Sequence, residues 1–138
     1  MKRLYIDIDG VLLTKKNIGV PEYGREFLKY LVNNFDCYWL TTHCRGDSLN
    51  AIQYLSSFYE KEIIEELNKV KSTNWDALKT EGIDLSTDFY WLDDYPFNAE
   101  KIVLEKNNLV ERLIIVDLDR SGELERIKCL LPTPAEAH

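Results

Sequence analysis

The chain has 138 residues, the length of one ordinary domain, and it is 45% hydrophobic and 30% charged, so it can bury a core of its own. A net charge of -7 argues against extended nucleic-acid binding, because phosphate contacts require a basic surface. No apolar run approaches the roughly 18 residues of a membrane span, and the N-terminal run is too short for a signal peptide. Three cysteines without a C-x-x-C spacing are typical of a reducing compartment, so we expect a cytoplasmic protein.

The hydrophobic pattern predicts strands that alternate with helices. Residues 3–8 read as a short buried strand, and residues 11–20 suit a loop or flap. Further along we expect a helix over 21–35, a strand over 36–41, one or two helices over 46–70, a short helix over 74–82, a strand over 88–92, a helix over 98–108, a strand over 112–118 and a helix over 121–131. Residues 1–131 should then form one domain, followed by a loose tail over 132–138.

This alternation predicts an α/β fold, with a mainly parallel sheet between two helical layers as in Rossmann-like three-layer sandwiches. In such sheets ligands bind beyond the carboxyl ends of the strands. Polar side chains follow each of the four predicted strands: Asp7 and Asp9; Thr41, Thr42 and His43; Asp93 and Asp94; and Asp117. The sequence therefore predicts one candidate site at one edge of the sheet.

The stretch "YIDIDGVLL" places two carboxylates, Asp7 and Asp9, at alternate positions where the first strand ends. They point the same way if the chain stays extended, whereas a turn at Gly10 would direct the second across the site. Crowded carboxylates repel one another unless a cation joins them, and hard oxygen ligands suit Mg²⁺. A metal with a spare carboxylate indicates phosphoryl chemistry, in which a lysine and a hydroxyl hold the phosphate.

Three motifs resemble those of the haloacid dehalogenase-like (HAD) phosphohydrolases. "DIDGVLL" is similar to the first motif of that family, "YWLTT" to the second and "FYWLDD" to the fourth, and they occur in the family's order over residues 4–94. The resemblance implies a HAD-like fold and a Mg²⁺-dependent phosphatase. It also implies a phosphorylated substrate, either a small molecule or the end of a macromolecule.

The resemblance also implies roles for individual residues. Asp7 would be the nucleophile that forms an aspartyl-phosphate. Asp9 would be the general acid and base, and its backbone carbonyl would contact the metal. Thr41 would hydrogen-bond the phosphoryl group, with Thr42 as the alternative if the strand ends one residue later.

Two parts of the family's site match this sequence less directly: the acidic residues of the fourth motif and the lysine of the third motif. Asp94 aligns best with the family's metal ligand, and Asp93, which stands where glycine is common, would bind the metal indirectly or through water. Lys71 and Lys79 both precede the third strand. Lys71 is favoured because a helix over 74–82 would start at the active-site edge and carry Lys79 roughly 7 Å away from it.

The loop residues near the strand ends complete the prediction. Gly10, His43 and Arg45 would line the substrate site. Asp117 and Asp119 repeat the D-x-D spacing but match no motif, and are interpreted as a turn and a helix cap.

The short spacing between the motifs leaves no room for a cap domain. We therefore expect an open site that meets a large substrate or is closed by a second subunit, as in a homodimer. Two alternatives from other classes remain: a receiver-like signalling domain that is phosphorylated once, and a catalytically silent binding protein that keeps the fold.

Overall fold

The computed structural model describes residues 1–132. Four parallel strands form one sheet in the order β2-β1-β3-β4. The strands are β1 (Arg3–Ile6), β2 (Asp36–Trp39), β3 (Phe89–Asp93) and β4 (Leu113–Ile115). The predicted α/β architecture with a parallel sheet is confirmed, and it is compatible with a Rossmann-like fold. Of the predicted tail over 132–138, all but Pro132 lies outside the described residues.

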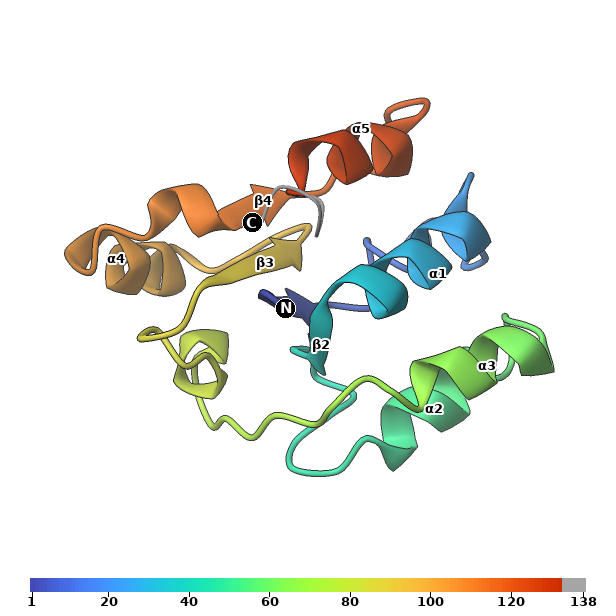
Figure 1. The fold of residues 1–138 in the computed structure, drawn as a ribbon, viewed down its shortest axis with the longest axis horizontal. Coiled ribbons are helices and arrows are strands. Elements are labelled where there is room, and N and C mark those ends of the chain that lie inside the picture. Colours follow the sequence, from blue (N-terminus) through green and yellow to red (C-terminus); the bar gives the residue numbers. More distant parts are fainter. Residues whose placement is uncertain (133–138) are drawn as a thin grey trace.

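Helices cover both faces of the sheet (Figure 1). Within residues 1–132 there are five α-helices and two short 3₁₀ helices: α1 (Gly24–Asn34), α2 (Leu49–Leu55), α3 (Lys61–Leu67), α4 (Asn98–Lys106), α5 (Glu123–Leu130), η1 (Lys79–Gly82) and η2 (Val110–Arg112). One face packs against α1, α2, α3 and α5, which share a single hydrophobic cluster. The other face packs against α4 and the segment around η1.

The alternation of side chains along β1 and β3 produces these two cores. Leu4 and Ile6 belong to the cluster beneath α1, whereas Tyr5 and Trp91 belong to the cluster beneath α4. Successive strand residues point to opposite faces, so the next position in phase with Tyr5 is residue 7. The sheet itself therefore directs the first acidic side chain toward the α4 side.

The chain turns sharply directly after β1. The predicted strand ends at Ile6 instead of residue 8, because the carbonyl of Ile8 accepts hydrogen bonds from the N–H groups of Val11, Leu12 and Leu13. Those bonds compete with continued strand pairing and fold residues 8–13 into a compact turn. The other predicted elements keep their order with shifted ends; β4 in particular is shorter than the predicted 112–118.

The predicted helix over 74–82 is wrong in its first half. Lys71 instead pairs in parallel with Tyr38, so that the chain runs extended beside β2, and only η1 is helical. The Oε1 atom of Glu81 accepts hydrogen bonds from the N–H groups of Asp76 and Ala77. These backbone donors are thus satisfied without a helix.

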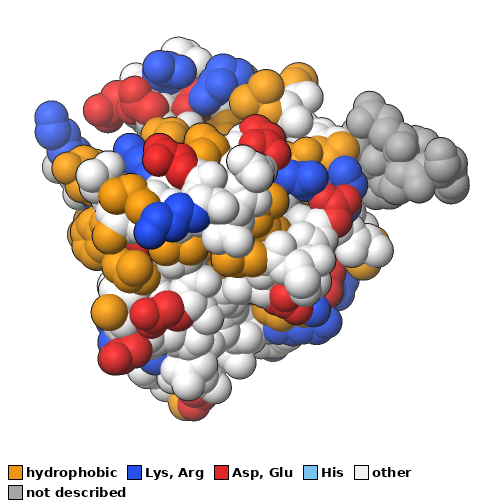
Figure 2. Space-filling view, turned by 90° about the vertical axis from the view of Figure 1, so that its left-hand side faces the viewer, with side chains coloured by type: hydrophobic (Ala, Val, Ile, Leu, Met, Phe, Trp, Pro, Cys, Tyr) orange, Lys and Arg blue, Asp and Glu red, His pale blue; other side chains and the backbone are white. Residues whose placement is uncertain are grey.

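The surface over α4 carries mixed charges. Figure 2 looks onto this face, where acidic, basic and hydrophobic side chains alternate over short distances. This view contains no broad basic field of the kind that an extended nucleic-acid groove requires. Among residues 1–132, every helix is too short or too polar to traverse a lipid bilayer.

Candidate metal and phosphate site

Three carboxylates meet at the carboxyl ends of β1 and β3. The N–H of Asp7 donates to the carbonyl of Leu92 at 3.1 Å, which extends the parallel register and places Asp7 beside Asp93. Asp94 follows directly, and one carboxylate oxygen from each of the three lies within 4.8 Å of the others. Asp7 and Asp93 are only 8% and 1% exposed. Burying two acids so close together requires compensating positive charge.

Lys79 supplies that charge. Its Nζ lies 3.0 Å from Asp7 Oδ2 and 2.7 Å from Asp93 Oδ2, and its side chain is 14% exposed. The Lys79 N–H donates to Glu100 Oε2 at 2.6 Å, and Glu100 Oε1 accepts from the N–H of Phe97. The buried Glu100 in the first turn of α4 therefore anchors the lysine. Sequence analysis missed Glu100, although a Glu at the third position of a helix is a known capping signal.

Lys71, the lysine favoured from the sequence, is not brought to this cluster. Its Nζ lies 2.9 Å from Asp36 Oδ1, and Asp36 is the first residue of β2, at the opposite end of the sheet from the site. The preference for Lys71 assumed a helix over 74–82. Because the chain is extended from Lys71 onward, it runs along β2 to the carboxyl edge of the sheet before it reaches Lys79.

Burial and mutual repulsion disfavour the charged form of the cluster's first carboxylate. Burial, followed by the charge of Asp93, raises the pKa of Asp7 to about 7, although Lys79 and the N–H of Ile8 act in the opposite direction. Burial alone would lower the pKa of Lys79, but the charges of Asp7 and Asp93 outweigh it and raise that pKa. One lysine therefore does not fully compensate the acids.

The raised pKa of Asp7 predicts that the stability of the protein depends on pH. The folded chain holds the Asp7 proton more tightly than the unfolded chain does. The resulting stabilisation is complete below the unfolded pKa of about 3.9 and is lost as pH rises through about 7. In EDTA, we expect the free energy of unfolding of the wild type to fall relative to Asp7→Asn between pH 5 and 8. Denaturant titrations that give parallel pH profiles for the two proteins would contradict this expectation.

The side chain of Asp9 points away from the cluster that contains Asp7, toward His43 and Tyr54. Its Oδ2 lies 2.9 Å from His43 Nε2, and its Oδ1 accepts a 2.9 Å hydrogen bond from the hydroxyl of Tyr54 in α2. The turn after Ile8 thus separates the two carboxylates, as expected if the chain bends at Gly10. Tyr54 was missed because no local pattern links it to Asp9, 45 residues earlier.

Gly10 allows the turn to approach the acidic pair. Its φ is +83°, and a Cβ at this position would lie 2.3 Å from Cγ of Asp94. Any larger residue would therefore displace Asp94 as well as strain the backbone. The Oδ2 atom of Asp94 also pairs with Nζ of Lys15 at 2.7 Å, so that the flap residue reaches over the cluster.

The residues that follow β2 differ in burial: Thr41 is buried, whereas Thr42 and Arg45 are exposed. Thr41 is 1% exposed, and its hydroxyl accepts a hydrogen bond from the N–H of His43 at 3.4 Å, which places it on the inner side of the loop. Thr42 is exposed. The guanidinium of Arg45 lies over the ring of Trp75 at 4.3 Å, which gives Arg45 a structural partner apart from the carboxylates. The structure thus buries Thr41 inside this loop and leaves Thr42 exposed.

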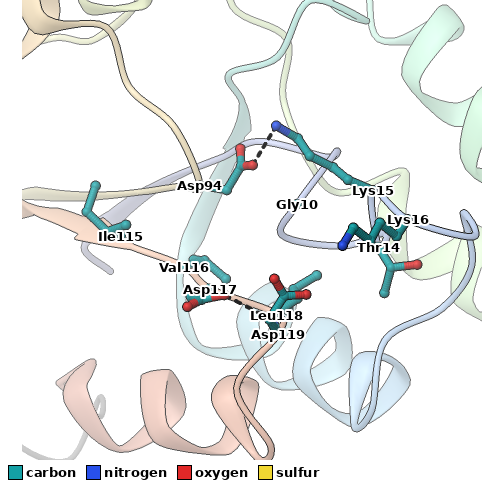
Figure 3. A pocket seen from close by; sticks show the side chains of 10 residues that line it. All are labelled: Gly10, Thr14, Lys15, Lys16, Asp94, Ile115, Val116, Asp117, Leu118 and Asp119. Atoms are coloured by element: carbon teal, nitrogen blue, oxygen red, sulfur yellow. Dashed lines mark hydrogen bonds and ion pairs between the residues drawn. The ribbon is translucent and has the colours of Figure 1, made fainter.

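A cavity of about 530 Å³ opens next to Asp94. The flap residues Lys15 and Lys16 lie on one side of it, and Asp117 and Asp119 lie on the other (Figure 3). Oδ1 of Asp117 accepts the N–H of Asp119, so the second D-x-D does form a turn after β4. The predicted helix cap is wrong, because α5 begins after Gly122 and has no side-chain cap. The cavity therefore has a polar rim of both signs beside the acidic cluster.

Comparisons with protein-family models, curated proteins and solved structures found no match.

Proposed function

We propose that this protein is a Mg²⁺-dependent phosphohydrolase that acts through an aspartyl-phosphate on Asp7. The observation that supports this proposal most is that the carboxylates of Asp7 and Asp9 lie in two different environments. Asp7 lies buried among Lys79, Asp93 and Asp94, whereas Asp9 is held apart by hydrogen bonds. One carboxylate is thus placed to bind or attack phosphorus, and the other to move protons.

The donor set fits Mg²⁺. Mg²⁺ prefers carboxylate oxygens as ligands, and the three carboxylates each offer one oxygen within 4.8 Å of the others. Both oxygens of Asp93 are engaged, by Lys79 and by the N–H of Tyr95. Asp94 is engaged through Oδ2, by Lys15. Both oxygens of Asp7 are also engaged, by the N–H of Ile8 and by Lys79. Because the HAD-like motifs place metal ligands at Asp7, the Asp9 carbonyl and Asp94, we assign these groups as direct ligands and Asp93 as the residue that holds Lys79.

The reaction balances with the residues present. A carboxylate oxygen of Asp7 forms a bond to phosphorus as the ester P–O bond breaks, and Asp9 gives its proton to the leaving oxygen. Asp9 then takes a proton from water, whose oxygen attacks phosphorus and releases Asp7 and inorganic phosphate. Lys79 and the Thr41 hydroxyl would hold the phosphoryl oxygens. A bound Mg²⁺ would supply charge neutralisation, which lets an anionic nucleophile approach an anionic phosphate.

The HAD-like motifs and the parallel sheet support the same proposal. The protein would then be a HAD-like phosphatase without a cap domain. The segment between the second and third strands supplies α2 and α3, whose buried residues share the core of α1 instead of a core of their own. The cavity beside Asp94 would receive part of the substrate, whose identity we leave at the level of a phosphate monoester. A second subunit could close it in a homodimer.

Turnover with and without metal tests the proposal. Purified protein should release phosphate repeatedly from p-nitrophenyl phosphate in Mg²⁺, and EDTA should abolish this release. A screen of phosphorylated metabolites, phosphopeptides and nucleic-acid termini would then rank substrates. Phosphorylation that occurs only once would indicate a receiver-like domain. No reaction with any ester, despite Mg²⁺ binding, would indicate a binding protein.

A further inference from the structure

The Asp9 carboxylate is held by an aromatic pair from outside its own loop. The rings of His43 and Tyr54 stack with centroids 4.2 Å apart and planes at 17°. One ring contacts each carboxylate oxygen, His43 through Nε2 and Tyr54 through its hydroxyl. The two partners come from different segments, the loop after β2 and α2.

The helix that carries Tyr54 is anchored in the core. Ala51 and Leu55, on the same helix as Tyr54, are fully buried in the core. The ring of Tyr54 also meets that of Phe58 edge-on, with centroids 5.7 Å apart. Asp9 itself sits on a turn with a side chain that is 38% exposed. An exposed carboxylate without such partners would sample several rotamers.

We propose that Tyr54, together with His43, is a positioning residue that fixes the general acid Asp9 toward the leaving-group oxygen. The inference rests on the proposed phosphatase function and makes α2 part of the catalytic apparatus. Proton transfer requires the acid to lie within hydrogen-bond reach of the leaving oxygen, and a carboxylate that rotates away loses that reach. The effect of Tyr54 on kcat/KM should therefore be larger for substrates whose leaving-group oxygen must be protonated before it departs.

Leaving-group dependence gives a specific readout. An alkyl alcohol is a far weaker acid than p-nitrophenol, so its ester needs protonation by Asp9 more. Tyr54→Phe removes the hydroxyl and keeps the ring. We expect it to lower kcat/KM for glycerol 2-phosphate about 10- to 100-fold, within the range of general acid catalysis, and for p-nitrophenyl phosphate far less. His43→Gln should act in the same direction and provides a second variant.

Tyr59→Phe is the matched control. The hydroxyl of this neighbouring residue is buried and donates to the carbonyl of Leu12 at 2.6 Å, not to Asp9. It should lower the melting temperature and leave the ratio of kcat/KM for the two esters unchanged. An equal loss on both esters in Tyr54→Phe and His43→Gln, or the same ratio change in Tyr59→Phe, would overturn the inference while the phosphatase proposal stands. A wild-type protein that hydrolyses neither ester would overturn both.

Discussion

Asp7→Asn should lower turnover of phosphate monoesters by a factor on the order of 10⁵ or more, the scale seen when a covalent nucleophile is removed. An amide oxygen can still accept the hydrogen bond from the N–H of Ile8, so the local geometry should survive. The variant should not be less stable than the wild type at pH 8 without metal, because the pKa of Asp7 is raised to about 7 and its charged form is the disfavoured one. Loss of activity would then be separated from loss of fold.

Two measurements accompany this variant. Acid-quenched wild-type protein should carry a phosphoryl group by intact mass spectrometry, and Asp7→Asn should not. Asp76→Asn makes the same chemical change at an exposed position and should retain full activity. Near-normal turnover by a verified Asp7→Asn protein would refute the covalent mechanism.

Lys79→Met should destabilise the metal-free protein by about 3–5 kcal/mol, the usual cost of leaving a buried charge unpaired. The substitution keeps most of the side-chain volume but leaves Asp7 and Asp93 without their cation. It should also abolish turnover, because no other described side chain contacts both carboxylates. Chemical denaturation in EDTA measures the first effect, and phosphate release in Mg²⁺ measures the second.

Lys71→Met is the matched control for Lys79→Met. The Lys71 side chain is 58% exposed and its pair with Asp36 lies on the surface, so its removal should change stability far less than the removal of Lys79. Mg²⁺ should restore part of the stability lost in Lys79→Met, because an ion that binds only the folded state shifts the equilibrium by mass action. A larger loss of activity in Lys71→Met than in Lys79→Met would contradict the assigned site.

The fold class follows largely from local patterns. Short apolar segments typical of strands alternate along the chain with segments of helical spacing, and this order predicts a parallel sheet. In such a sheet the residues after each strand meet at one edge. That argument brings Asp7 together with Asp93 and Asp94, since all three belong to strands or strand ends that the pattern identifies. Element ends were less predictable, because turns such as residues 8–13 are stabilised by backbone hydrogen bonds that hydrophobic spacing does not reveal.

By itself, then, the sequence determined the α/β architecture and an acidic cluster at the carboxyl edge of its sheet, because both depend on alternation within single segments. The tertiary structure alone decided that Lys79, not Lys71, neutralises this cluster, since that choice depends on the path of an extended segment paired with β2. It also decided that Asp9 faces His43 and Tyr54. These contacts join residues 34 and 45 positions apart, and such pairs form only when separately folded segments pack together.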